Sequence, residues 1–281
     1  FTRQQRGAGR VPTERLPYFG EMAQAHLSDL DTLVVIGSKP PVSFFAYPDK
    51  PGWLSPKDAT VIRMGDHSVD AINTLERIAN ALGASDRVSN VAQRVELELE
   101  HGPITAVELG KGIANRLPEN AIVSDEGATN GLGAFLMTEN AAPHDWLTLT
   151  GGAIGQGLPL ALGAAVACPD RKVLALEADG SAMYTVQALW TMVRENLDIT
   201  VLILNNGSYA ILNIELARVG VAQPGPTALS LLDLTNPSIQ WTDIATGMGM
   251  AAQRVDTVEA LDAALASAMS EYGPRLIEVM L

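Results

Sequence analysis

The sequence has a single cysteine, few charged side chains and no apolar run long enough to cross a membrane. One cysteine excludes an internal disulfide framework and a cysteine-based zinc site, and Cys168 ends an apolar segment, which predicts a buried structural thiol. The longest apolar run, residues 158–168, contains a proline and is too short for a transmembrane helix. Residues 1–18 are basic and polar and lack the apolar core of a signal peptide. We therefore expect a soluble, cytoplasmic protein.

Basic residues are outnumbered, with 19 Lys and Arg against 32 Asp and Glu, and the formal net charge is −13. Such a charge argues against nucleic acid and against an anionic membrane as partners. Hydrophobic residues make up 47% of the chain and charged residues only 18%. That balance predicts a sheet covered on both faces, or surface buried in a homo-oligomer such as a dimer or tetramer.

The stretch from Glu177 to Tyr209 organises the rest of the chain. Residues 172–176 and the continuous apolar run 199–204 are expected strands, and residues 185–195 have helical periodicity, with Trp190 and Met192 expected in the core. Asp179 and Asn206 follow the two strands and lie 27 positions apart, about one βαβ unit. Their side chains should converge at one sheet edge and suit Mg²⁺, which prefers oxygen ligands.

Strands and helices alternate along the remaining chain, which predicts an α/β fold with a doubly wound parallel sheet. Polar turns at 125–130, 178–181 and 205–209 should lie at the ligand-binding edge. The predicted domains are a partial, Rossmann-like domain at 1–83, a linker at 84–102 and a cofactor-binding domain at 103–281. Other predicted helices are 19–30, 70–82, 104–117, 158–168, 242–248 and 258–270, and other predicted strands are 32–37, 60–64, 121–124, 146–150 and 276–281.

Residues 150–157, TGGAIGQG, match the glycine pattern of short-chain dehydrogenases. Such patterns are weak without their context. That family places the pattern near the start of its domain and also needs a tyrosine followed four positions later by lysine. Tyr184 is followed at that offset by Ala188 and Tyr209 by Asn213, so the dehydrogenase hypothesis ranks third. The same glycines would let a flat heterocycle approach the backbone.

The run from Ala178-Asp179-Gly180-Ser181 to Asn205-Asn206 resembles the GDGS…NN motif with which thiamine-diphosphate enzymes bind diphosphate and magnesium. The sequences GGAIGQGLPLALGAAVACPDRKV and SAMYTVQALWTMVRENL resemble the branch that contains acetolactate synthase and benzoylformate decarboxylase. The resemblance implies the thiamine-diphosphate-binding fold from about residue 103 to 281 and the second half of that family's central domain before it.

The resemblance also implies roles for individual residues. The metal ligands would be Asp179, Asn206 and the backbone carbonyl of Ser208. Diphosphate and cofactor contacts would come from Ala128, Thr129, Gly180, Ser181 and Tyr209. Ile154 would be the wedge that bends the cofactor, and the Gly152 carbonyl would accept a hydrogen bond from its aminopyrimidine. Gly152 and Ile154 are thus the implied catalytic positions, and His144 is a further side chain that could approach the site.

Two departures from the family pattern matter. Ala178 replaces the first glycine of the motif, so the turn requires an ordinary backbone conformation there, which we predict. The family's pyrimidine-binding domain, with its activating glutamate, is absent from these residues, and neither Glu126 nor Glu177 lies in a matching motif. We therefore expect the chain to be a fragment or one half of a clipped enzyme, inactive without that domain, which would come from a missing N-terminal region or another subunit.

The predicted function is the cofactor-binding portion of a thiamine-diphosphate-dependent lyase or transferase, a 2-oxo acid decarboxylase or carboligase similar to acetolactate synthase. Its cofactors would be thiamine diphosphate and Mg²⁺, and its substrate a small 2-oxo acid. A lyase similar to benzoylformate decarboxylase and a catalytically inactive cofactor-binding or assembly module are the alternatives. The sequence leaves open both the substrate and the use of FAD.

Overall fold

The computed structural model describes residues 3–84, 86 and 90–281. The chain forms two compact units, one of Phe1–Thr13 with Asn90–Leu281 and the other of Glu14–Ser89. The predicted boundaries differ from this division. The first 13 residues and residues 90–102 belong to the larger unit, where the sequence predicted a separate domain and a linker.

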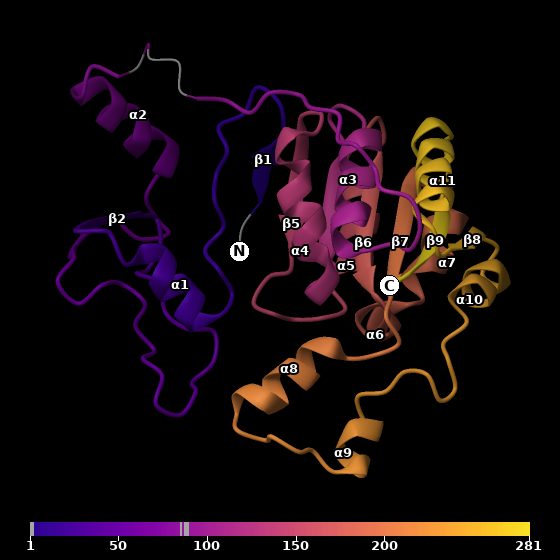
Figure 1. Cartoon of the computed structure of the whole chain (residues 1–281). Helices are drawn as coiled ribbons and strands as arrows, with labels where there is room; N and C mark the ends of the chain where they lie inside the picture. Colours follow the sequence, from indigo (N-terminus) through magenta and orange to yellow (C-terminus); the bar gives the residue numbers. More distant parts are fainter. Residues whose placement is uncertain (1–2, 85, 87–89) are drawn as a thin grey trace. The chain divides into compact units, whose positions relative to one another are not determined.

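The larger unit is built on a seven-stranded sheet in the order β1-β5-β4-β6-β7-β9-β8 (Figure 1). Its strands are β1 (Gln4–Arg6), β4 (Ile122–Glu126), β5 (His144–Thr148), β6 (Val173–Ala178), β7 (Ile199–Asn205), β8 (Ala251–Val255) and β9 (Arg275–Met280). Every pair is parallel except β1 with β5. All seven residues of β7 are buried, as expected for a central strand of a parallel sheet covered on both faces.

Alternate residues of each strand feed two separate cores, one on each face of the sheet. On β6, Leu174 and Leu176 belong to one core, and Val173 and Ala175 to the other. The first face is covered by α3 (Ala106–Arg116), α4 (Ala128–Met137) and α11 (Val258–Ser270). The second is covered by α5 (Gly157–Ala167), α6 (Asp179–Ala182), α7 (Ala188–Arg194) and α10 (Trp241–Gly247). Each fully buried leucine contributes about 1.5–3 kcal/mol, so these cores stabilise the scaffold that carries the strand ends.

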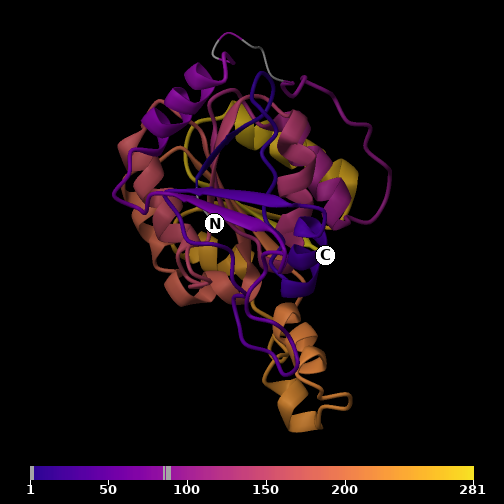
Figure 2. The ribbon, with the colours of Figure 1, turned by 90° about the vertical axis from the view of Figure 1, so that its left-hand side faces the viewer.

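The remaining elements of the larger unit are short. They are η1 (Thr138–Asn140), η2 (Met183–Thr185), α8 (Ala210–Arg218) and α9 (Pro226–Ser230). The segment with α8 and α9 extends away from the sheet (Figure 2). Its two ends meet at the turn after β7, where Ser208 forms an antiparallel bridge with Asp233 and the Tyr209 amide donates to the Leu232 carbonyl at 2.9 Å.

The smaller unit contains α1 (Gly20–Leu27), β2 (Thr32–Ile36), β3 (Thr60–Met64) and α2 (Ala71–Ala81). The two strands are parallel, with Thr32 opposite Thr60. The core cluster described in this unit is small: Ala23, Leu27 and Leu54, with Leu16 against them. None of the residues of α2 is buried, although its sequence is amphipathic.

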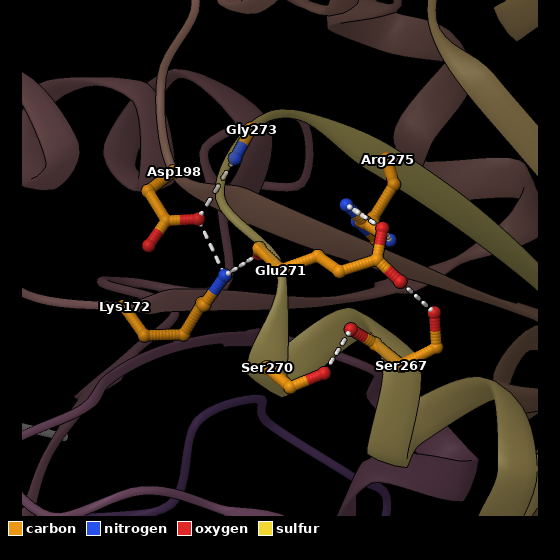
Figure 3. A network of polar contacts seen from close by, with 7 residues as sticks. All are labelled: Lys172, Asp198, Ser267, Ser270, Glu271, Gly273 and Arg275. Atoms are coloured by element: carbon orange, nitrogen blue, oxygen red, sulfur yellow. Dashed lines mark hydrogen bonds and ion pairs between the residues drawn. The ribbon is translucent and has the colours of Figure 1, made fainter.

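Polar side chains tie the amino ends of the strands to the end of α11 (Figure 3). Lys172, before β6, pairs with Asp198, before β7, and donates to the Glu271 carbonyl at 2.7 Å. The Gly273 amide donates to the same Asp198 carboxylate at 3.1 Å. The Glu271 side chain accepts from Ser267 at 2.5 Å and pairs with Arg275 at 3.3 Å. Each of these charged groups has a hydrogen-bond or ion-pair partner, so the contacts at this edge of the sheet stabilise the folded protein.

Most of the predicted strands and helices are present, and the doubly wound parallel sheet is confirmed. The differences concern several unpredicted elements and the burial of two side chains. The edge strands β1 and β8 are short and have no continuous apolar run, and the helices α4 and α8 were not predicted either. Trp190 was expected in the core but is 51% exposed, whereas Met192 on the same helix is fully buried. Cys168 is half-buried, not fully buried, at the end of α5.

Among the described residues, no helix combines the length and the apolar character needed to cross a bilayer.

Candidate functional site

The three predicted polar turns follow β4, β6 and β7, which are neighbours in the sheet. Because these strands are parallel, their carboxyl ends lie at one edge, where open α/β sheets bind ligands. The glycine turn 151–157 follows β5, the neighbour of β4, and reaches the same edge. The sheet therefore brings together segments that are separated by up to about 80 residues in the sequence.

Asp179 links the turns after β6 and β7. Its carboxylate accepts the Gly180 amide at 2.8 Å and, across the strands, the Gly207 amide at 2.8 Å. The side chain of Asn206 accepts the Ser208 amide at 3.1 Å within the second turn. Burial raises the pKa of Asp179, although these backbone hydrogen bonds partly oppose the rise. A cation beside this carboxylate would reverse the effect of burial.

The predicted diphosphate-contacting residues begin short helices at this edge. Gly180 and Ser181 lie in α6 and are buried. A side chain at Gly180 would place its first carbon 2.3 Å from the Tyr209 ring, so the close approach of that ring requires glycine. Ala178 has φ −69°, which confirms the prediction that the turn tolerates alanine there. Ala128 and Thr129 open α4 and are exposed, and Ala128 has the strained value φ 47°.

The glycine turn presents Gly152 and Ile154 to solvent, and Ile154 is 39% exposed. Two side chains from other elements hold the turn. The Thr185 hydroxyl donates to the Gly155 carbonyl at 3.0 Å. The Glu126 carboxylate accepts the amides of Gly155 and Gly157, the second at 2.5 Å. The turn is thus fixed from η2 and from the end of β4.

Two buried glutamates stand side by side beneath the glycine turn. The strand register places Glu126 opposite Glu177, and they are 2% and 0% exposed. Among the described residues, neither carboxyl oxygen of Glu177 has a hydrogen-bond partner. Burial, reinforced by the charges of Glu126 and Asp125, raises the pKa of Glu177 well above its usual value. Burial also raises the pKa of Glu126, against the opposing effect of the turn amides.

Sequence reasoning placed Glu126 and Glu177 near this edge but missed their contacts. The pairing of neighbouring strands would have predicted that they are adjacent, because both lie at the ends of apolar runs. Sequence reasoning also missed the role of Asn205. Its side chain is buried and donates a hydrogen bond to Glu278 at 2.7 Å, so it holds neighbouring strands together. His144 does not approach the site. It is the first residue of β5, at the opposite edge, and its Nδ1 is 2.7 Å from the Ala142 carbonyl.

The fold and these turns define an α/β protein whose polar turns gather at the carboxyl ends of its parallel strands. Residues 126–279 match the family model for the C-terminal TPP-binding domain of thiamine pyrophosphate enzymes. The match covers more than half of the chain, so the chain belongs to the thiamine pyrophosphate enzymes and contains their C-terminal cofactor-binding domain.

Known proteins agree with this assignment. The chain is 48% identical over 277 residues to "Putative acetolactate synthase large subunit IlvX" of Mycobacterium tuberculosis, covering 98% of this chain and 53% of that protein. It is 32% identical over 228 residues to benzoylformate decarboxylase of Pseudomonas aeruginosa, covering 80% and 42%. A solved thiamine diphosphate-dependent 4-hydroxybenzoylformate decarboxylase of Rhodococcus jostii superposes with a TM-score of 0.74 at 26% identity, covering 94% and 51%. The chain thus spans about half the length of the relatives it matches.

Proposed function

We propose that the chain forms the diphosphate- and Mg²⁺-binding half of a thiamine-diphosphate-dependent enzyme that acts on a small 2-oxo acid, as an acetolactate synthase-like carboligase or decarboxylase. One observation carries the proposal: Asp179 and the 206–208 turn, from adjacent strand ends, meet through a 2.8 Å hydrogen bond. This places a carboxylate, a carboxamide and backbone carbonyls within one small region at the ligand-binding edge.

The residues present fit such a cofactor. The Asp179 carboxylate is 2% exposed and forms no ion pair within the described part of the chain, so a cation would supply the missing charge. Mg²⁺ is held by few protein oxygens and takes the rest from phosphate and water. Asp179, Asn206 and the Ser208 carbonyl would hold the metal.

Other residues of this edge would bind and orient the organic cofactor. Gly180 and Ser181 would contact the diphosphate, as would Ala128 and Thr129 at the start of α4. The exposed Ile154 would set the cofactor's bend, and the Gly152 carbonyl would orient its aminopyrimidine. When bound, thiamine diphosphate supplies the electron sink for cleavage next to the carbonyl of a 2-oxo acid.

We further propose that turnover needs a second polypeptide part, a pyrimidine-binding domain from upstream sequence or another subunit of a cytoplasmic homo-oligomer. Two buried glutamates support this requirement. Glu126 is bound to the amides of the glycine turn, and Glu177 is fully buried beside Gly157, so neither is free to protonate the aminopyrimidine. The same observation favours the second candidate, a module that binds the cofactor without turning it over.

Calorimetric titration with thiamine diphosphate, with and without Mg²⁺, tests the proposal. We expect Mg²⁺-dependent binding, and we expect Asp179→Asn to weaken it at least about a hundredfold because a charged ligand is lost. Asp170→Asn, an exposed aspartate at the opposite edge, is the matched control and should bind like the wild type. Absence of Mg²⁺-dependent binding by the wild type would refute the proposal. Pyruvate consumption by this chain alone would refute the need for a second part.

A further inference from the structure

We propose that Glu126 is a positioning residue of this site: from the end of β4 it caps helix α5 and fixes the glycine turn that carries Gly152 and Ile154. This inference rests on the proposed cofactor role of that turn. Glu126 itself would touch neither cofactor nor substrate, and would act through the backbone.

The first step is the hydrogen bonding. The Glu126 carboxylate accepts one backbone amide with each oxygen: Oε1 from Gly155 and Oε2 from Gly157. Gly155 lies within the turn and Gly157 is the first residue of α5, so one carboxylate spans the point where turn becomes helix. Among the described residues, the two hydrogen bonds that the Glu126 carboxylate accepts both come from residues 151–157. Its role is therefore directed at this segment.

The second step is the start of α5. The residue before this helix, Gln156, provides no side-chain cap, and the first turn of the helix contains no acidic residue. Free amides at a helix start need acceptors, and a negative charge there is favourable. Glu126 supplies both from a neighbouring strand. The direction of α5, and with it the end of the glycine turn, is thus set by the sheet.

The third step is the packing around Gly157. A side chain there would place its first carbon 2.1 Å from a carboxyl oxygen of Glu177 and 2.8 Å from Cβ of Glu126. The backbone of the turn therefore lies directly on the two glutamates. Little space therefore separates the Gly157 backbone from the two glutamate side chains.

The consequence concerns the two residues that face the ligand. Gly152 and Ile154 lie three and one positions before Gly155, and the Thr185 hydroxyl adds only one neutral hydrogen bond to that residue. Hydrogen bonds to a charged acceptor are roughly twice as strong as neutral ones. Together with the Gln156 side chain, which accepts the Thr150 amide at 3.2 Å, Glu126 therefore helps to set where the Gly152 carbonyl and the Ile154 side chain lie.

Two measurements on purified Glu126→Gln test the proposal. A glutamine carboxamide has one acceptor oxygen, so its NH₂ group would face the second amide and that hydrogen bond would be lost. We expect amide hydrogen exchange in residues 151–157 of the cofactor-free protein to accelerate about tenfold or more, and thiamine diphosphate affinity with Mg²⁺ to fall about tenfold or more. If this variant does not fold, Glu126→Asp, whose shorter side chain cannot span both amides, should show the same changes.

Glu108→Gln is the matched control. Glu108 is also buried, 5% exposed, and accepts a backbone amide, that of Glu100, at 2.9 Å, but it lies on α3 away from the glycine turn. It should lower overall stability without accelerating exchange in 151–157 or weakening the cofactor. Unchanged exchange in Glu126→Gln would overturn the proposal, as would faster exchange with unchanged affinity. If the wild type fails to bind the cofactor, the proposed function fails, while the exchange comparison still decides whether Glu126 holds the turn.

Discussion

The main sheet has an amino edge and a carboxyl edge, at the two ends of its parallel strands, and the partners of the charged side chains differ between them. At the amino edge, charges are paired: Lys172 with Asp198, and Asp145 with both Arg171 and Arg3. At the carboxyl edge, Glu126 and Asp179 accept backbone amides, and Glu177 has no partner among the described residues. Within the described part of the chain, none of these three carboxylates forms an ion pair.

The pKa values follow the same division. Burial works to raise the pKa of Asp145, but hydrogen bonds from Arg171 and Arg3 outweigh it, and the pKa lies below the usual value. Burial raises the pKa of Asp179, Glu126 and Glu177, which have no such cations among the described residues. One edge therefore contributes stability, while the other buries carboxyl groups without a cation among the described residues, at some cost in stability. Substitutions should separate these two roles.

The largest effect is expected at the amino edge, from Lys172→Met. The Lys172 side chain is 8% exposed and Asp198 is 15% exposed, so the variant leaves a mostly buried carboxylate without its cation. We expect the free energy of unfolding to fall by roughly 3 kcal/mol, measured by urea denaturation, with cofactor affinity unchanged. Arg194→Met, which breaks an exposed pair with Glu195, should cost less than about 1 kcal/mol. A loss of affinity in the folded Lys172 variant would contradict the division between the edges.

A comparable effect is expected from acid, through His144 at the amino edge. Burial lowers the pKa of His144 to about 4. An imidazole in the unfolded chain titrates near 6.5, so between these values the unfolded state binds the extra proton. This contribution to stability is complete above pH 6.5 and is lost as the pH falls toward 4, in total about 3 kcal/mol.

Denaturation series between pH 4 and 7 check this expectation by comparing the wild type with His144→Gln. The difference in unfolding free energy between the two proteins should shrink as the pH falls, because only the wild type carries the buried imidazole. His67→Gln removes a solvent-exposed histidine and is the matched control for the loss of an imidazole. A constant difference between wild type and His144→Gln would show that His144 does not titrate in this range.

At the carboxyl edge, a substitution that removes a buried carboxyl group should raise the free energy of unfolding instead of lowering it. Glu177→Met replaces a fully buried carboxyl group that has no partner among the described residues with an apolar side chain of similar size. Removing an unsatisfied buried polar group should raise the free energy of unfolding by about 1–3 kcal/mol at neutral pH. Glu119→Met, at an exposed position, should change it by less than about 0.5 kcal/mol. A destabilised Glu177→Met would mean that the carboxyl group makes a favourable contact in the folded protein.

The sequence predicted the carboxyl edge better than the amino edge, for a physical reason. Central strands such as β6 and β7 are buried on both faces, so their apolar runs show where they end, and the polar residues that follow mark the edge. The pairing at the amino edge is different. Lys172 and Asp198 are ordinary charged residues before strands, and Glu271 is almost 100 positions away from Lys172. Nothing in their local sequence predicts the contact.

Within the site, the motif residues were predictable and their supports were not. Asp179 and Asn206 could be placed because their spacing matches one βαβ unit. The role of Glu126 depends on the conformation of the glycine turn, which brings Gly155 and Gly157 back to the end of β4. The exposure of Trp190 was missed because helical spacing indicates one apolar side of α7 but does not tell how much of it the sheet covers.

The smallest effect should come from Ala128, where the carboxyl edge stores backbone strain. Its φ of 47° is unfavourable for alanine, and glycine adopts such values at little cost. Glycine also makes the unfolded chain more flexible, which offsets part of the gain, so Ala128→Gly should raise the free energy of unfolding by only about 0.5–1 kcal/mol. Ala263→Gly, at an exposed position inside α11, should instead lower it by about 1 kcal/mol. If both variants lost stability equally, Ala128 would not be strained, and the carboxyl edge would owe its lower stability to its unpaired carboxylates alone.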